Sequence, residues 1–150
     1  MTLAVSGKGS TFFKNCSGYI FSIIFQAFAA ILNPGDEIIV FDPAYTGYKT
    51  PIAYFGANMV RSKQIKSKEG HFRPDFANLE AAITPKTKAI LFCTPDNPSG
   101  TVWTKDELKK LAEIAVKHDI AIISDEIYTE HIWGGKKHET MIDLPGMWER

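Results

Sequence analysis

Cysteine is scarce in this 150-residue sequence, and neither sign of charge dominates it. The two cysteines, Cys16 and Cys93, lie far apart, and Cys93 falls in an apolar stretch, which favours a reduced, buried thiol. The four histidines show no spacing typical of metal ligands, so no metal site is predicted. Because 17 basic residues balance 17 acidic ones, the composition gives no general attraction to nucleic acid or to an anionic membrane.

A hydrophobic run long enough to cross a membrane is also missing. The uncharged stretch 18–32 is shorter than the roughly 20 apolar residues that a span needs. Lys8 and Lys14 precede it, and the small residues Ala27 and Ala29 lie in its second half, which is also compatible with a signal sequence. We expect instead a buried helix packed on a sheet, because the stretch stops at the turn that begins with Asn33 and an α/β pattern follows.

Residues 88–128 are typical of one strand–helix–strand unit. Residues 88–94 form an apolar run of the length of a buried strand, which prolines and a glycine then break. Thr104 and Glu107 form a capping box that predicts the start of a helix with one apolar face. A second apolar strand is predicted over 120–124. Two strands joined by such a helix are expected to be parallel, with a right-handed crossover.

The same alternation of strand and helix extends upstream of this unit. A turn at Asn33 leads into a strand predicted over 37–41. A helix is predicted over 45–55, ending at Gly56, which suits the position after a helix C-terminus. A strand over 57–65 and a short helix over 75–83 complete the pattern. The sequence therefore predicts an α/β fold with a single core.

Three polar side chains follow the two strands of the 88–128 unit. Asn97 comes after the first strand, and Asp125 and Tyr128 come after the second. Ligands of open α/β sheets bind beyond the carboxyl ends of the strands, so the three side chains are expected to converge. An amide, a carboxylate and a phenol suit a planar, nitrogen-containing ligand with a hydroxyl group. The alternative, that Asn97 only shapes a turn and Asp125 only caps a helix, stays open at this point.

Four motifs occur in the order typical of one enzyme family. They are LNPGDEIIVFDPAYTGY (32–48), NPSG (97–100), SDEIY (124–128) and HETMIDLPGMWER (138–150). Together they resemble the class I/II aminotransferases, which are fold-type-I pyridoxal-phosphate enzymes. The resemblance implies a three-layer α/β/α fold with a mostly parallel sheet, in which residues 1–150 form a partial large domain.

The resemblance also implies a role for each candidate residue. Asp125 would pair with the pyridine nitrogen of pyridoxal 5'-phosphate, while Asn97 and Tyr128 would hydrogen-bond its 3-hydroxyl. Tyr45 matches the aromatic position that stacks on the ring, although a plain core or surface tyrosine is the alternative. Tyr48 is expected only to pack. No phosphate-binding role is assigned to Ser17-Gly18, because large apolar residues follow where small polar ones are expected.

The family's Schiff-base lysine has no counterpart in the sequence, so no catalytic residue is assigned. The implied function is amino-group transfer between an amino acid and a 2-oxo acid, by a truncated chain that we expect to be inactive alone. The full-length protein is expected to be a cytoplasmic homodimer. Two alternatives remain: a carbon–sulfur lyase or other pyridoxal-phosphate enzyme acting on α-amino acids, and a non-catalytic remnant.

Overall fold

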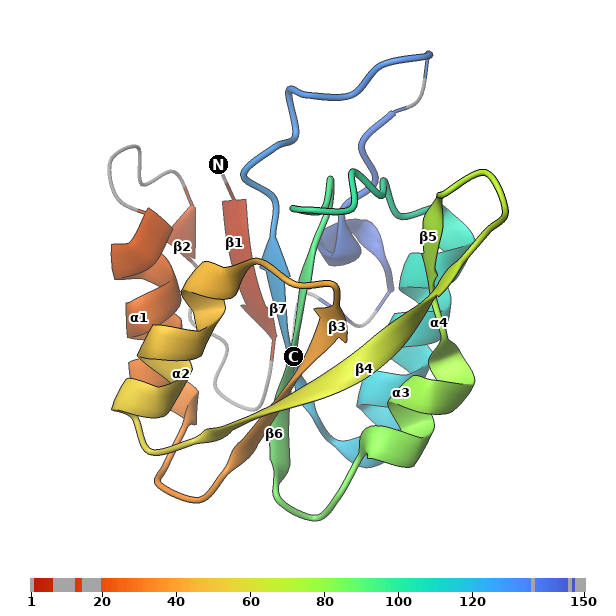
Figure 1. Ribbon diagram of the computed structural model, residues 1–150. Helices are drawn as coiled ribbons and strands as arrows, with labels where there is room; N and C mark the ends of the chain where they lie inside the picture. The colour runs from red at the N-terminus through yellow and green to blue at the C-terminus, as the bar shows by residue number, and fades with distance from the viewer. Residues whose placement is uncertain (1, 7–12, 15–19, 136, 146, 148–150) are drawn as a thin grey trace.

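The computed structural model describes residues 2–6, 13–14, 20–135, 137–145 and 147. Within these residues a seven-stranded sheet has the order β2-β1-β7-β6-β3-β4-β5 (Figure 1). The strands are β1 (Thr2–Ser6), β2 (Phe13–Lys14), β3 (Glu37–Asp42), β4 (Asn58–Lys66), β5 (Phe72–Pro74), β6 (Thr87–Cys93) and β7 (Ala121–Asp125). The helices are α1 (Ile20–Ile31), α2 (Lys49–Tyr54), α3 (Phe76–Ala82) and α4 (Lys105–His118), with 3-10 turns at Thr46–Tyr48 and Met141–Asp143.

The centre of the sheet is parallel and its edges are antiparallel. β7 pairs with β6, β6 with β3 and β3 with β4 in parallel register. β1 runs antiparallel to β7, and β5 runs antiparallel to β4. Helix α4 connects the parallel neighbours β6 and β7, as predicted for residues 88–128. The prediction of an α/β fold with a mostly parallel sheet is confirmed.

Helices cover both faces of the sheet. The side chains of β3 alternate between the faces, as the two-residue period of a strand requires. Ile38 and Val40 lie in a buried cluster with α1 and α2, whereas Ile39 and Phe41 lie in a second cluster with α3 and α4. Figure 1 shows α1 and α2 on one side of the sheet and α3 and α4 on the other. The predicted three-layer arrangement is therefore present.

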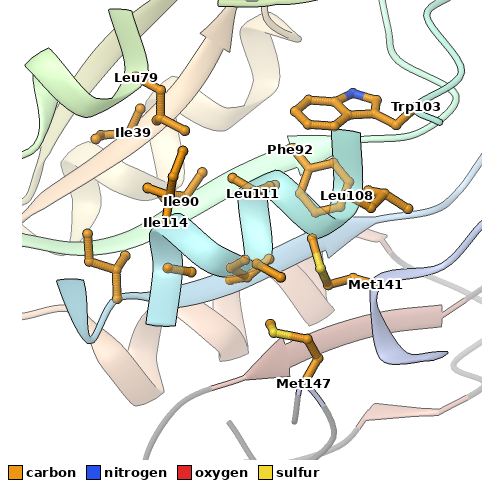
Figure 2. Packing of buried hydrophobic residues seen from close by; sticks show 14 of the residues in the cluster. Ile39, Leu79, Ile90, Phe92, Trp103, Leu108, Leu111, Ile114, Met141 and Met147 are labelled. Carbon is orange, nitrogen blue, oxygen red and sulfur yellow. The ribbon is translucent and has the colours of Figure 1, made fainter. Parts of the chain in front are cut away.

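The larger apolar cluster lies between α4 and the sheet (Figure 2). Leu108 and Leu111 of α4 are fully buried there, at 0% exposure. The Trp103 ring closes one end of the cluster, with its centroid 4.9 Å from that of Phe92 and 4.9 Å from that of Phe41. This packing anchors α4 and fixes the turn that precedes it.

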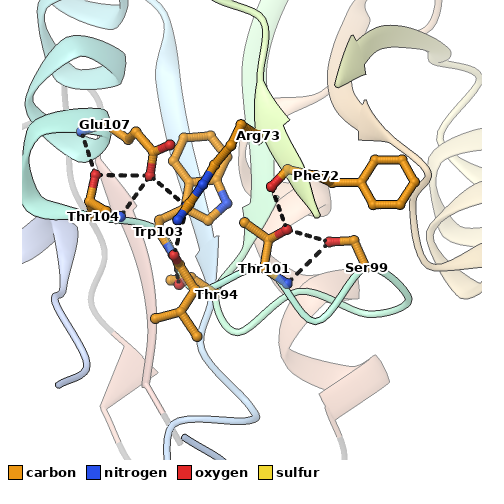
Figure 3. Close-up of polar contacts among 9 residues, drawn as sticks. Phe72, Arg73, Thr94, Ser99, Thr101, Trp103, Thr104 and Glu107 are labelled. Atoms are coloured by element: carbon orange, nitrogen blue, oxygen red, sulfur yellow. Dashed lines mark hydrogen bonds and ion pairs between the residues drawn. The ribbon is translucent and has the colours of Figure 1, made fainter. Parts of the chain in front are cut away.

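The capping box predicted for α4 is formed. The Thr104 hydroxyl accepts a hydrogen bond from Glu107 N at 3.3 Å, and Glu107 Oε2 accepts one from Thr104 N at 2.8 Å. Glu107 Oε2 also pairs with Arg73 Nη1 of β5 at 3.1 Å, and Arg73 donates to Val102 O at 3.0 Å (Figure 3). These contacts thus join the start of α4 to the edge strand β5.

The helix predicted over 45–55 is wrong in its first part. A 3-10 turn occupies Thr46–Tyr48, and the α-helix begins only at Lys49. Pro51 explains the difference, because proline is tolerated in the first turn of a helix but clashes with the preceding turn in a helix interior. A helix starting at residue 45 would place Pro51 in its interior.

Helix α1 is the buried element that was expected for residues 18–32. Ile23, Ile24, Ala27 and Phe28 are each at most 3% exposed and pack with α2 against the sheet. No helix among the described residues has both the length and the apolar character needed to span a membrane.

Two glycines with left-handed backbone conformation precede β3 and β4 and join the amino-terminal ends of these strands by a hydrogen bond. Gly35 has φ +89° and Gly56 has φ +68°. Gly35 N donates to Gly56 O at 2.9 Å, and a Cβ atom on Gly56 would approach Pro34 Cβ to 3.2 Å. Side chains are therefore disfavoured at position 56 by both conformation and space.

Candidate functional site

The candidate site lies at the carboxyl ends of β6 and β7. Cys93, the last residue of β6, is in register with Asp125, the last residue of β7. Thr94 N donates to Asp125 O at 3.0 Å and continues this pairing past the strand end. Residues that follow the two strands consequently begin from neighbouring points at one edge of the sheet.

A tightly bonded turn positions Asn97. Asp96 Oδ2 accepts hydrogen bonds from Ser99 N at 3.3 Å and from the Ser99 hydroxyl, and Asp96 N donates to Thr101 O at 2.9 Å. The Thr101 hydroxyl in turn donates to Phe72 O of β5 at 3.0 Å (Figure 3). Burial raises the pKa of Asp96, and the hydrogen bonds from Ser99 oppose that rise. The turn is thus held by its own side chains and by the edge strand.

The structure brings all four predicted residues to one place. Asn97 Nδ2 donates to the Tyr128 hydroxyl at 3.3 Å, across 31 residues of sequence. A cavity of about 80 Å³ is lined by Tyr45, Asn97, Asp125 and Tyr128, together with Tyr48, Cys93 and Ile127. The predicted convergence is present, whereas the cofactor-binding roles of these residues stay predictions.

Asp125 is the buried acid of this cavity, at 4% exposure. Its Oδ2 accepts a hydrogen bond from the Tyr48 hydroxyl at 2.7 Å, and its Oδ1 accepts one from Ile127 N at 3.2 Å. Burial raises the pKa of Asp125, because a charged carboxylate loses hydration there, while these two hydrogen bonds oppose the rise. The alternative in which Asp125 only caps a helix does not hold, because the residues that follow it form a turn.

Tyr48 has a polar contact that the sequence interpretation missed. Its ring is buried, as expected of a packing residue, at 4% exposure. Its hydroxyl nevertheless reaches Asp125, 77 residues away. The available signal was the choice of tyrosine over phenylalanine, because a buried phenol usually has a hydrogen-bond partner.

Tyr45 and Tyr48 come from one turn and border the cavity together. Their rings meet edge to face, with centroids 5.4 Å apart and planes at 87°. The Tyr45 ring lies so close to Gly47 that a Cβ atom at that position would overlap it. A glycine at position 47 therefore permits the observed placement of the half-buried Tyr45 ring.

Glu126 is a second buried acid that sequence reasoning did not single out. Its Oε1 accepts hydrogen bonds from the Ser124 hydroxyl at 2.9 Å and from the Thr140 hydroxyl at 2.8 Å, and its Oε2 lies 3.0 Å from His138 Nε2. These contacts fasten the segment around residues 138–140 to the end of β7. Glu126 faces its own set of partners and is not part of the cavity lining.

Two further predictions concern ions and phosphate. In the part of the chain that the structure describes, no three histidine, cysteine, aspartate or glutamate side chains are grouped so that they could hold a metal ion. The possible phosphate-binding segment Ser17-Gly18 lies outside the described residues.

The sequence matches the family model for aminotransferase class I and II over residues 8–147. It is 41% identical over 124 residues to a putative aminotransferase, YugH, of Bacillus subtilis, covering 83% of this chain and 31% of that protein. It is 39% identical over 136 residues to kynurenine–oxoglutarate transaminase 3 of Rattus norvegicus, covering 85% of this chain and 30% of the relative.

Solved structures show the same similarity. N-succinyldiaminopimelate aminotransferase of Mycobacterium tuberculosis superposes with a TM-score of 0.81 at 28% identity, over 97% of this chain and 35% of that one. Cystalysin of Treponema denticola, whose structure contains a pyridoxal 5'-phosphate cofactor, gives 0.78 at 30% identity, over 83% and 32%. The chain spans about a third of the length of its relatives. On the family match over most of its length, the chain belongs to the aminotransferase class I and II family.

Proposed function

We propose that this chain is the cofactor-binding part of a pyridoxal-phosphate-dependent aminotransferase, a partial large domain whose cavity at the ends of β6 and β7 receives the pyridine ring. The observation that carries the proposal is the convergence of Asp125, Asn97 and Tyr128 on one cavity. Relatives named as aminotransferases support this class of enzyme. Similar solved structures that contain pyridoxal phosphate support the choice of cofactor.

The donors and acceptors of the cavity fit such a ring. Asp125 is a buried acceptor at 4% exposure, and an ionised carboxylate there favours a protonated ring nitrogen as its partner. Asn97 donates to the oxygen of Tyr128, so the phenol hydrogen of Tyr128 remains available to a ligand. The second hydrogen of the Asn97 amide is available as well. Under this proposal, both hydrogens are available as donors to the ring 3-hydroxyl oxygen.

The bound cofactor would act as an electron sink for bond changes at the α-carbon of an amino acid. Asp125 would hold the proton on the ring nitrogen, which sustains that property. Asn97 and Tyr128 would orient the ring through its 3-oxygen, and Tyr45 would cover one ring face. A wider hollow of about 530 Å³ shares Asn97 and Tyr128 with the cavity, and we assign it to the amino acid and 2-oxo acid substrates.

The covalent anchor is proposed to come from outside these 150 residues. Among the described residues, no lysine lines the cavity. The chain by itself should therefore bind the cofactor without a covalent bond and should not transfer amino groups. The homodimer and the cytoplasmic location implied by the resemblance remain part of this proposal. A carbon–sulfur lyase would use the same cavity, so turnover of amino acids by a longer chain is needed to separate these two activities.

The test is a titration of the purified chain with pyridoxal 5'-phosphate, followed by absorbance and tryptophan fluorescence. Asn97→Ala and Asp125→Ala should each weaken binding on the order of tenfold or more, because a hydrogen bond to a charged group contributes about 1.5–3 kcal/mol. Asp143→Asn, at an exposed aspartate, is the matched control. Equal affinities for all four proteins would contradict the proposal.

A second measurement addresses the lysines. Borohydride reduction of the mixture, followed by peptide mapping, should leave no lysine labelled in stoichiometric amount. One lysine labelled in full would show that the chain carries its own covalent anchor.

A further inference from the structure

We propose that Tyr48 is a positioning residue for Asp125: its hydroxyl holds one carboxylate oxygen, so that the acid meets the ring nitrogen of the cofactor ionised and in a fixed orientation. This inference rests on the proposed function and extends it to Tyr48, which the sequence analysis expected only to pack. It starts from the 2.7 Å hydrogen bond between the Tyr48 hydroxyl and Asp125 Oδ2.

The geometry constrains the carboxylate from both sides. Tyr48 donates to Oδ2, and Ile127 N donates to Oδ1 at 3.2 Å. Because each oxygen has its own donor, rotation of the carboxylate about its Cβ–Cγ bond would weaken both contacts. Each carboxylate oxygen can accept more than one hydrogen bond, so acceptor capacity remains for a ligand.

Among the described residues, Tyr48 supplies the one side-chain hydrogen bond to Asp125. Cys93 lies beside both groups, but its thiol donates to Pro95 O at 3.1 Å. Burial raises the pKa of both Tyr48 and Cys93, and the neighbouring Asp125 charge raises them further. Both groups therefore stay neutral at physiological pH, and Tyr48 remains a hydrogen-bond donor.

The position of the Tyr48 hydroxyl is fixed by the core. The ring belongs to the buried cluster of α1, α2 and β3. Tyr48 N donates to Tyr45 O at 3.2 Å within the 3-10 turn, and the two rings meet edge to face. A single turn would thus supply both Tyr45, which would stack on the cofactor ring, and Tyr48, which donates a hydrogen bond to Asp125.

The electrostatic consequence concerns the ionised form of Asp125. Burial raises its pKa, the nearby Glu126 adds to the rise, and the donors Tyr48 and Ile127 lower it. Loss of the phenol hydroxyl should therefore raise the pKa of Asp125 further. At any pH around its titration midpoint, a larger fraction of the acid would then be protonated, and a protonated acid cannot hold a proton on the ring nitrogen.

The test uses Tyr48→Phe, which keeps the ring and removes only the hydroxyl. Carbon-13 NMR of the Asp125 carboxyl in the cofactor-free chain should show its titration midpoint moved to higher pH. Tyr54→Phe, at a 72% exposed tyrosine of the adjacent helix α2, should leave the midpoint unchanged. An unchanged midpoint in Tyr48→Phe would overturn the proposal.

Cofactor binding gives the second readout. The affinity of Tyr48→Phe for pyridoxal 5'-phosphate should fall several-fold, and the loss should become smaller as the pH rises, because deprotonation of Asp125 at higher pH makes the two proteins more alike. A loss of equal size at every pH would mark a purely structural role and would contradict the proposal. Failure of the wild-type chain to bind the cofactor would reject the proposed function, while the carboxyl titration would still decide the role of Tyr48.

If Tyr48→Phe does not fold, site-specific 3-fluorotyrosine at position 48 replaces it. Fluorination makes the phenol a stronger hydrogen-bond donor while the ring stays in place. The Asp125 midpoint should then move to lower pH. A midpoint that stays in place or rises would overturn the proposal.

Discussion

Cys93 and Asp125 stand opposite each other in register, as the last residues of the parallel strands β6 and β7. Both side chains line the same cavity. This pairing explains why residues 31 positions apart, Asn97 and Tyr128, can share a hydrogen bond just beyond the sheet. The site is therefore a product of strand register more than of any single motif.

Asp125→Asn should change the pH dependence of stability. The buried acid has a raised pKa in the folded chain, so between its unfolded value of about 3.9 and the raised value the folded state holds the extra proton. Stability from this group is thus present at acid pH and lost as pH rises through that interval. Relative to the wild type, Asp125→Asn should gain stability as the pH rises through that interval.

Urea unfolding at several pH values measures this difference. Asp143→Asn, at an exposed position, serves as the control and should follow the wild-type curve. A difference between Asp125→Asn and the wild type that is constant with pH would argue against a raised pKa of the acid.

Glu126→Ala should destabilise the chain strongly. The change would leave Ser124, Thr140 and His138 without their buried partner, and breaking a buried charged network costs about 3–5 kcal/mol. Glu126→Gln keeps one carbonyl acceptor and should cost less. Glu130→Ala, at an exposed glutamate nearby, should have almost no effect. Urea unfolding gives the free energies, and equal losses for the alanine and glutamine variants would disprove the network interpretation.

Thr104→Ala should cost about 1 kcal/mol, because it removes the hydroxyl that accepts from Glu107 N at the start of α4. Thr104→Ser keeps a hydroxyl and should retain most of the stability. Thermal unfolding of the two variants beside the wild type provides the comparison. The cap would have no energetic role if serine and alanine gave the same loss.

Leu111→Ala should cost about 2–5 kcal/mol, since it opens a cavity under α4 at a fully buried position. Val116→Ala lies on the same helix but is 44% exposed, so its cost should stay near 0.5 kcal/mol. The two free energies of unfolding are measured in urea. Similar values would mean that α4 does not pack on the sheet as described.

The parts of the fold that the sequence predicts well depend on local signals. The β6–α4–β7 unit follows from two apolar runs and a capping box, and its observed bounds differ from the predicted ones by about one residue. The helix predicted over 45–55 was wrong in its first part because the effect of Pro51 on its starting point was not considered. The strand β1, antiparallel to β7, was not predicted, since its partner lies far along the chain.

The residues of the candidate site also fall into those that local sequence signals predict and those that tertiary packing determines. Asn97, Asp125 and Tyr128 follow strand ends, so the position of a strand in a parallel sheet is enough to bring them together. Tyr48 and Glu126 were missed because their partners are set by tertiary packing. The Tyr48 hydroxyl reaches across 77 residues, and the Glu126 contacts depend on how the chain returns at residues 138–140.

The Gly35–Gly56 closure lies at the amino-terminal ends of β3 and β4, the opposite end of the sheet from the cavity. Substitutions at this end should lower the stability of the folded molecule and leave the geometry of the candidate site unchanged. Conversely, substitutions at Asn97 and Tyr128 could alter the candidate site while leaving the Gly35–Gly56 hydrogen bond intact as an independent source of stability. The two ends of the sheet can thus be varied separately.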